Sequence, residues 1–81
     1  MLFRSLLQIA EQDLTALYSK HFIDARQADA TAGNENASAT FRRSADAFKA
    51  YRDAECARHG GGDALTACMV ELTQRRALDL R

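Results

Sequence analysis

The chain has no proline and no tryptophan, and its 81 residues include only four glycines and two cysteines. Without proline, no position is barred from a helix interior, and the scarcity of β-branched residues disfavours a sheet. Eleven basic side chains balance eleven acidic ones, so no net field attracts nucleic acid or an anionic membrane surface. No apolar run approaches the roughly 20 residues of a membrane span. We therefore expect an all-α protein with no membrane span and no nucleic-acid partner.

The N-terminal decamer MLFRSLLQIA is apolar but is interrupted by Arg4, Ser5 and Gln8. It is too short and too interrupted to form a convincing signal peptide. We see no signal peptide in this chain, and the sequence alone leaves the route of any export open.

Three stretches carry the three-four spacing of apolar residues that is typical of amphipathic helices. We expect helices over residues 2–31, 38–59 and 63–80, joined by a small polar loop at 32–37 and a glycine turn at 60–62. This organisation predicts one domain over residues 1–81, with three helices in an up-down-up arrangement. Asp63 is expected to cap the third helix. Its inner face is expected to carry Leu65, Cys68, Leu72 and Leu78.

Cys56 and Cys68 lie on opposite sides of the glycine turn, with eleven residues between them. In an antiparallel αα-hairpin they would meet at the same height near the bend. A disulfide there would remove loop entropy worth about 3 kcal/mol and would staple the last two helices. Two other interpretations stay open, namely reduced core thiols and a metal site with His59. The metal site would lack both the paired C-x-x-C spacing and a fourth ligand.

Arg52 lies one helical turn before Cys56, on the side expected to face the third helix, where a charge needs a partner. The register of the two cysteines places Glu71 at the same height. We therefore predict a structural Arg52–Glu71 ion pair, with Glu55 as the local alternative. Direct contact of Arg52 with a binding partner is the competing interpretation.

The expected helices differ in length, since the first would span about 42 Å and the third about 26 Å. Alignment at the 32–37 loop places Leu14 near the level of Cys56, so that residues 1–10 project past the hairpin bend. An apolar overhang of this kind predicts an interface, for example in a homodimer. The candidate interface residues are Leu2, Phe3, Leu6, Leu7 and Ile9.

Residues suited to catalysis are few. His21 and His59 are far apart in sequence and neither adjoins an obvious nucleophile. The glycine run at 60–62 lacks the Lys and Ser/Thr of a phosphate-binding loop. We therefore expect no enzymatic activity, no cofactor and no metal site.

Three runs of the chain resemble the N-terminal domain of the LprI-type lysozyme inhibitors, a family of bacterial cell-envelope proteins. They are the FKAYRDAEC segment at 48–56, the glycines at 60–62 and the CMVELTQRR segment at 68–76. A weaker similarity covers AEQDLTALY at 10–18. The chain departs from the family pattern at four features: Phe48 replaces a tryptophan, Ala45 a glutamine and Thr15 an asparagine, and the additional N-terminal cysteines are missing.

The resemblance implies a helical, disulfide-bearing domain of the periplasm or cell envelope. It also implies a non-catalytic protein-binding module, either an inhibitor of a lysozyme-type peptidoglycan hydrolase or an immunity protein against one. We assign Tyr51, Arg52 and Asp53 as the candidate partner contact. The alternative function is a structural or assembly protein that oligomerises through its apolar first helix.

Overall fold

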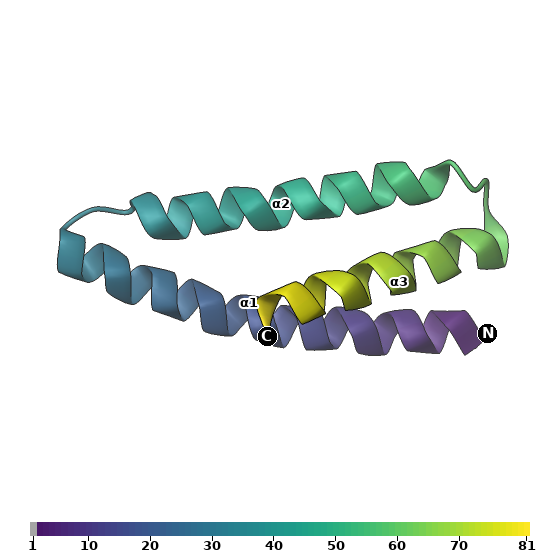
Figure 1. Cartoon of the computed structure of the whole chain (residues 1–81), viewed down its shortest axis with the longest axis horizontal. Coiled ribbons are helices and arrows are strands. Elements are labelled where there is room, and N and C mark those ends of the chain that lie inside the picture. Colours follow the sequence, from purple (N-terminus) through teal and green to yellow (C-terminus); the bar gives the residue numbers. More distant parts are fainter. Residues whose placement is uncertain (1) are drawn as a thin grey trace.

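The computed structural model describes residues 2–81, except for the side chain of Leu2, and consists of three α-helices (Figure 1). The helices are α1 (Leu2–Ala32), α2 (Asn36–Ala57) and α3 (Gly62–Leu80). They run up, down and up, and a disulfide between Cys56 and Cys68 joins α2 to α3. The predicted all-α class with a stapled αα-hairpin is confirmed.

The junction between α1 and α2 is held by Asp29. Gly33 ends α1 with a φ of 75°, and its N–H donates to the Asp29 carbonyl at 2.8 Å. The Asp29 carboxylate accepts the backbone N–H groups of Ala37 at 2.7 Å and Ser38 at 3.0 Å, and also the Ser38 hydroxyl. Free N–H groups at the start of α2 are thus capped from α1. Because of this cap, α2 begins at Asn36, two residues earlier than expected.

The junction between α2 and α3 depends on glycine. Gly60 and Gly62 have φ values of 84° and 69°, which side chains with a Cβ rarely adopt. The N-cap of α3 is Gly61 rather than Asp63, which lies inside the first turn. There its charge still favours the positive end of the helix dipole.

The buried face of α3 is not the one predicted from the sequence. Its buried residues are Val70, Thr73 and Ala77, whereas Leu78 is 67% exposed. Helix α3 packs against both other helices, and the short side chains of Thr73 and Ala77 are buried in these contacts. Leu65 and Leu72 are half-buried at the edges of this contact.

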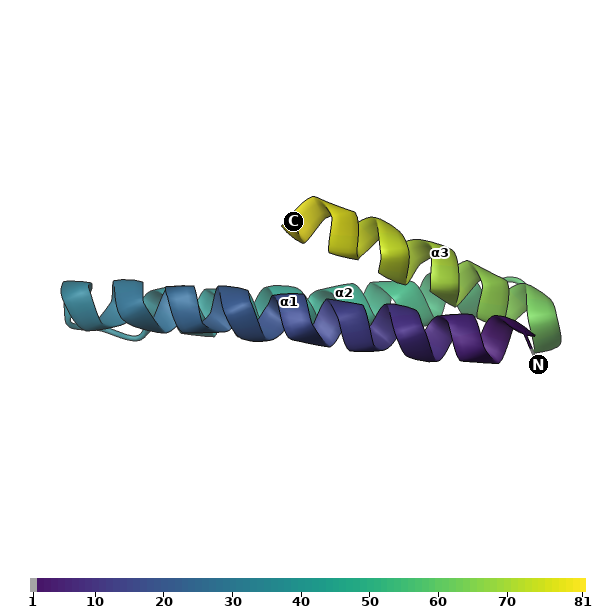
Figure 2. The same ribbon diagram turned by 90° about the horizontal axis from the view of Figure 1, so that it is seen from below.

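Residues 2–10 do not project past the hairpin bend. Helix α3 runs beside the first half of α1 (Figures 1 and 2). Arg4 lines a common cavity with Gly62 and Leu65. The predicted alignment of Leu14 with Cys56 was wrong. Glu11 of α1 pairs with Arg52, and Cys56 lies one turn further along α2, which is still closer to the N-terminus of α1. At the opposite end of the molecule, α1 and α2 extend past the C-terminal end of α3.

The last turn of α3 is fastened to the middle of α1. The His21 imidazole Nε2 lies 2.6 Å from the Leu80 carbonyl oxygen, and Arg81 pairs with Asp13. Figure 2 shows that α3 nevertheless rises away from the plane of α1 and α2 towards its C-terminus. The molecule is elongated, with extents of 47 × 21 × 15 Å. None of the three helices, over the residues described, is both long and apolar enough to cross a bilayer.

Candidate functional site

Arg52 is the buried centre of a polar cluster that ties the three helices together. Its side chain is only 6% exposed, and its Nε donates to Asp53 Oδ1 at 3.0 Å. Its Nη1 donates to Thr73 Oγ1 of α3 at 3.2 Å and lies 3.4 Å from Glu11 Oε2 of α1. A planar guanidinium with five N–H donors suits such a three-way contact. We call these four residues the Arg52 cluster.

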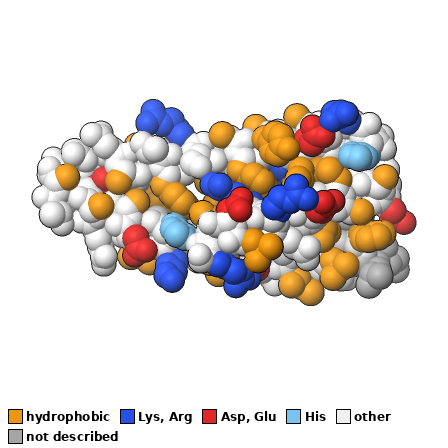
Figure 3. All heavy atoms as spheres, viewed as in Figure 1, with side chains coloured by type: hydrophobic (Ala, Val, Ile, Leu, Met, Phe, Trp, Pro, Cys, Tyr) orange, Lys and Arg blue, Asp and Glu red, His pale blue; other side chains and the backbone are white. Residues whose placement is uncertain are grey.

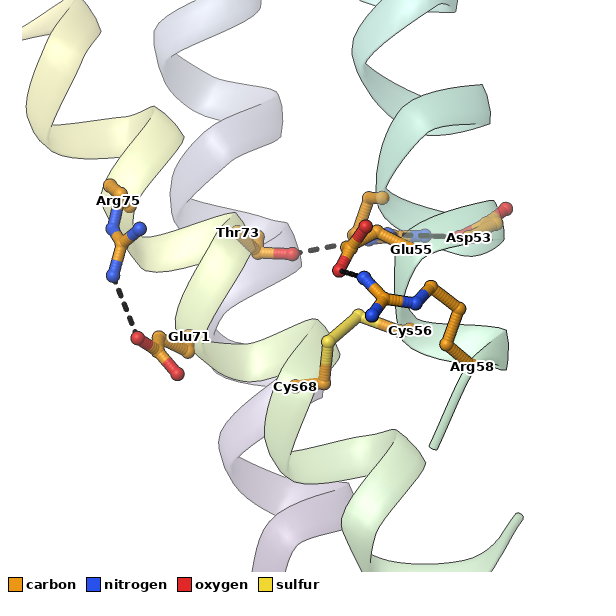
Figure 4. The surroundings of a disulfide bond; sticks show 9 residues. Asp53, Glu55, Cys56, Arg58, Cys68, Glu71, Thr73 and Arg75 are labelled. Atoms are coloured by element: carbon orange, nitrogen blue, oxygen red, sulfur yellow. Dashed lines mark hydrogen bonds and ion pairs between the residues drawn. A yellow bond between two sulfur atoms is a disulfide. The ribbon is translucent and has the colours of Figure 1, made fainter. Parts of the chain in front are cut away.

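The predicted Arg52–Glu71 ion pair is wrong. Glu71 lies on the outer side of α3 and pairs with Arg75 at 2.7 Å (Figure 4). Glu55, the local alternative, pairs with Arg58 instead. The orientation of α3 explains the difference, because it directs Thr73 rather than Glu71 towards α2.

Cys56 follows Arg52 by about one turn of α2. Its disulfide to Cys68 braces the same part of the hairpin (Figure 4). The Cα atoms of Cys56 and Cys68 are 5.5 Å apart, and Cys56 is fully buried. Both thiols are consumed, which excludes the reduced-thiol and metal interpretations that the sequence left open. Over residues 2–81, no group of three or more potential ligands is placed to hold a metal ion. A structural disulfide is typical of compartments outside the reducing cytosol.

Asp53 anchors the Arg52 cluster from the surface. Burial alone would raise the pKa of its carboxyl group, but hydrogen bonds from Lys49 and Arg52 outweigh burial and lower that pKa. Asp53 therefore stays ionised at neutral pH and holds the Arg52 guanidinium. Its contacts indicate a positioning role within the fold.

The three residues assigned as the candidate partner contact differ in accessibility. Arg52 is 5% exposed and points inwards, and Asp53 is occupied by its two cationic neighbours. Tyr51, in contrast, is 55% exposed on the outside of α2. Arg52 and Asp53 thus make contacts within the fold, whereas Tyr51 is exposed.

Tyr51 belongs to a shallow surface between α2 and α3, which we call the α2–α3 face. A cavity of about 200 Å³ opens there. The Arg76 guanidinium lies 5.7 Å from the centre of the Phe48 ring and donates to Ser44 at 3.0 Å. The cavity is lined by Phe48, Tyr51, Leu72, Arg75, Arg76 and Asp79.

The sequence reasoning missed most of the α2–α3 face. Leu78 was placed inside the bundle, and the neighbouring arginines received no role. Tyrosine and arginine side chains are enriched at the centres of protein interfaces, and this face carries Tyr51, Arg75 and Arg76. The adjacent pair Arg75-Arg76, which has no acidic residue next to it in sequence, was the available signal.

The candidate interface on the first helix is partly covered. Phe3 and Leu6 are each 36% exposed and Ile9 is 62% exposed, while Leu7 is half-buried. The side chain of Leu2 lies outside the described residues. Only part of the expected apolar stripe is therefore accessible.

Comparison of the sequence with known protein families gives a match to one family. A family model described as lysozyme inhibitor LprI matches residues 3–80. No curated protein and no solved structure matches the chain. The matched range contains all four members of the Arg52 cluster and both cysteines.

Proposed function

We propose that this chain, which belongs to the family of the lysozyme inhibitor LprI, is a protein-binding module that inhibits a lysozyme-type peptidoglycan hydrolase. The observation that carries the proposal is the family match over residues 3–80. That match includes the motif residues that build the Arg52 cluster and the disulfide. The family is one of inhibitors, so the module acts by binding and not by catalysis.

We further propose that the protein is located in the periplasm or elsewhere in the cell envelope. The Cys56–Cys68 disulfide needs an oxidising compartment to form and persist. Peptidoglycan and the enzymes that hydrolyse it are found in the same compartment. An immunity protein is the related case, in which the target is a hydrolase that the cell itself secretes.

The α2–α3 face is the surface that we assign to the hydrolase. Glycosidases of this class carry a pair of carboxyl groups, one on each side of the scissile bond. Arg75 and Tyr51 lie on the accessible side of the face, where the Arg75 side chain is 64% exposed. In a complex, Arg75 would exchange its exposed pair with Glu71 for a carboxylate of the cleft, and Tyr51 would pack beside it.

Titration of a muramidase with the purified, oxidised protein tests the proposal. Tyr51→Ala and Arg75→Ala should each weaken inhibition by roughly tenfold, since truncated hot-spot residues cost more than about 1 kcal/mol. Lys20→Ala, an exposed change on α1, is the matched control and should leave inhibition unchanged. Equal inhibition by all four proteins would remove the α2–α3 face from the account.

A second candidate function is assembly through α1. Phe3, Leu6 and Ile9 remain exposed, and Figure 3 shows hydrophobic side chains gathered at the end of the molecule where α1 begins. Light scattering on the wild type should then reveal a dimer that Leu6→Glu with Ile9→Glu converts to a helical monomer. A wild-type monomer at high micromolar concentration would exclude this function.

A further inference from the structure

Among residues 2–81, Arg76 is the one half-buried cation that forms no ion pair. The other basic side chains without an ion pair are all exposed, so water solvates their charges. They are Arg4, Lys20, Arg26, Arg42 and Arg43. A charge that is partly removed from water and has no counter-ion is unfavourable. A negative group placed beside Arg76 would therefore stabilise this part of the molecule.

Helix α2 holds the Arg76 guanidinium in place. The guanidinium lies 5.7 Å from the centre of the Phe48 ring, and its Nη2 donates to Ser44 Oγ at 3.0 Å. Its Nε is buried without a partner. Its Nη1 also makes no hydrogen bond within residues 2–81 but, unlike Nε, is not buried. Nη1 is therefore the donor that an incoming group can meet, on a guanidinium that is already oriented.

Arg76 forms part of the wall of the cavity of about 200 Å³ on the α2–α3 face. Phe48 and Leu72, which are half-buried, give this cavity apolar walls. Arg75 lines the cavity as well, but its charge is paired with Glu71 at 2.7 Å (Figure 4). The cavity thus combines apolar surface for a short aliphatic stem with one unpaired positive charge.

Asp79 does not neutralise this charge. It follows Arg76 by three residues on α3, a spacing at which ion pairs form on helices, and it lines the same cavity. The guanidinium nevertheless turns towards Ser44 and Phe48 of α2, and Asp79 forms no ion pair within the described residues. Because Asp79 is exposed, water solvates its carboxylate. The Arg76 charge therefore stays open to an external group.

We propose that the cavity of the α2–α3 face receives one acidic side chain of the protein partner, whose carboxylate pairs with Arg76. The carboxylate would accept from Nη1, and the aliphatic stem would lie against Phe48 and Leu72. The apolar walls lower the local dielectric constant and so strengthen this pair relative to one in water. Arg76 is then a specificity-determining residue, because a partner with a neutral or basic side chain at this position leaves the cation unpaired.

The identity of the partner rests on the proposed function. Tyr51 and Arg75, which we assign to the hydrolase, line the same cavity as Arg76. The acidic side chain would therefore belong to the rim of the hydrolase cleft, beside the carboxylate that Arg75 meets. The preference for a carboxylate does not rest on the proposed function, since it follows from the charge and walls of the cavity.

Nuclear magnetic resonance titration with Ac-Glu-NHMe, a glutamate whose backbone ends are blocked, tests this preference without any hydrolase. Ac-Gln-NHMe has the same shape and a neutral side chain, and it serves as the control ligand. At constant ionic strength, the glutamate ligand should shift the resonances of Phe48, Tyr51 and Arg76 with a dissociation constant in the millimolar range. The glutamine ligand should bind at least fivefold more weakly.

Three variants locate the contact. Arg76→Met keeps the stem but removes the charge, and it should abolish the difference between the two ligands. Arg75→Met, which removes the adjacent cation, is the matched control and should preserve that difference. Asp79→Asn, an exposed change, should tighten glutamate binding roughly twofold because a like charge leaves the cavity. Absence of wild-type binding, equal binding of the two ligands, equal loss in the two arginine variants, or weaker binding by Asp79→Asn would overturn the proposal.

Muramidase inhibition by the same proteins separates this proposal from the proposed function. Arg76→Met should weaken inhibition by at least about tenfold, with the helical content of the wild type retained. Full inhibition by Arg76→Met would refute the assignment of the cavity to the hydrolase. A wild type that prefers the glutamate ligand but inhibits no hydrolase would refute the inhibitor function alone.

Discussion

Replacement of Arg52 by methionine is the perturbation that most directly tests how this fold is held. Methionine keeps much of the volume of the arginine stem but donates no hydrogen bonds. The change therefore removes the contacts to Glu11, Asp53 and Thr73 while leaving the apolar packing largely filled.

The three contacts contribute unequally to the free energy of unfolding. The Glu11 and Asp53 side chains are 49% and 42% exposed, so water solvates both after the loss and each ion pair contributes about 0–1 kcal/mol. Thr73 is fully buried, and its hydroxyl would lose the Arg52 donor, at a cost of about 1–3 kcal/mol. We expect a total destabilisation of about 2–3 kcal/mol, most of it through Thr73.

Urea denaturation followed by circular dichroism measures this loss. The double variant Arg52→Met with Thr73→Val should recover much of it, because both partners are then replaced by apolar groups of similar shape. Arg75→Met, which removes the exposed pair with Glu71, is the matched control and should cost less than about 0.5 kcal/mol. A loss below about 0.5 kcal/mol for Arg52→Met, or additive losses in the double variant, would refute the reasoning.

Three further outcomes follow from the structure. Cys56→Ala with Cys68→Ala should lower the free energy of unfolding by about 3 kcal/mol, and an unchanged denaturation midpoint would contradict the staple. The Ser38 hydrogen bond lowers the pKa of Asp29, so its stabilisation is present above pH about 3.8 and is lost as the pH falls below that value. Asp29→Asn should flatten the acid side of the stability profile, and an identical profile would count against the cap. Gly60→Ala should destabilise by about 1 kcal/mol because φ is positive there, whereas Gly61→Ala, with a negative φ, should not; equal thermal melting of the two would exclude backbone strain.

The helices and the disulfide could be predicted because their signals are local. Glycines at 60–62 end one helix and begin the next. The cysteines lie four residues before this turn and six residues after it, and they define the height at which the hairpin closes. The partner of Arg52 could not be predicted in the same way. Glu71 and Thr73 lie at similar heights, and only the packing of α3 against two helices at once decides which of them faces α2.

The sequence pattern also could not predict how α1 is aligned along the other two helices. Residues 1–10 were expected to project, because the loop length alone was used to align α1 with α2. The side chain of Asp29 instead caps α2 from within α1 and shifts the pairing. This contact joins residues eight and nine positions apart, across the loop between the helices, and it leaves no periodic signal in the sequence.

Inhibition of a muramidase at increasing molar ratios of this protein is the measurement that tests the central claim most directly. The protein is oxidised, its disulfide verified by mass spectrometry, and the enzyme assayed on cell-wall peptidoglycan and on a small soluble substrate. We expect activity to fall stoichiometrically on both substrates, and Tyr51→Ala and Arg75→Ala to shift the titration to higher protein concentration. Full enzymatic activity at a large molar excess of the wild-type protein, across several lysozyme-type hydrolases, would contradict the account.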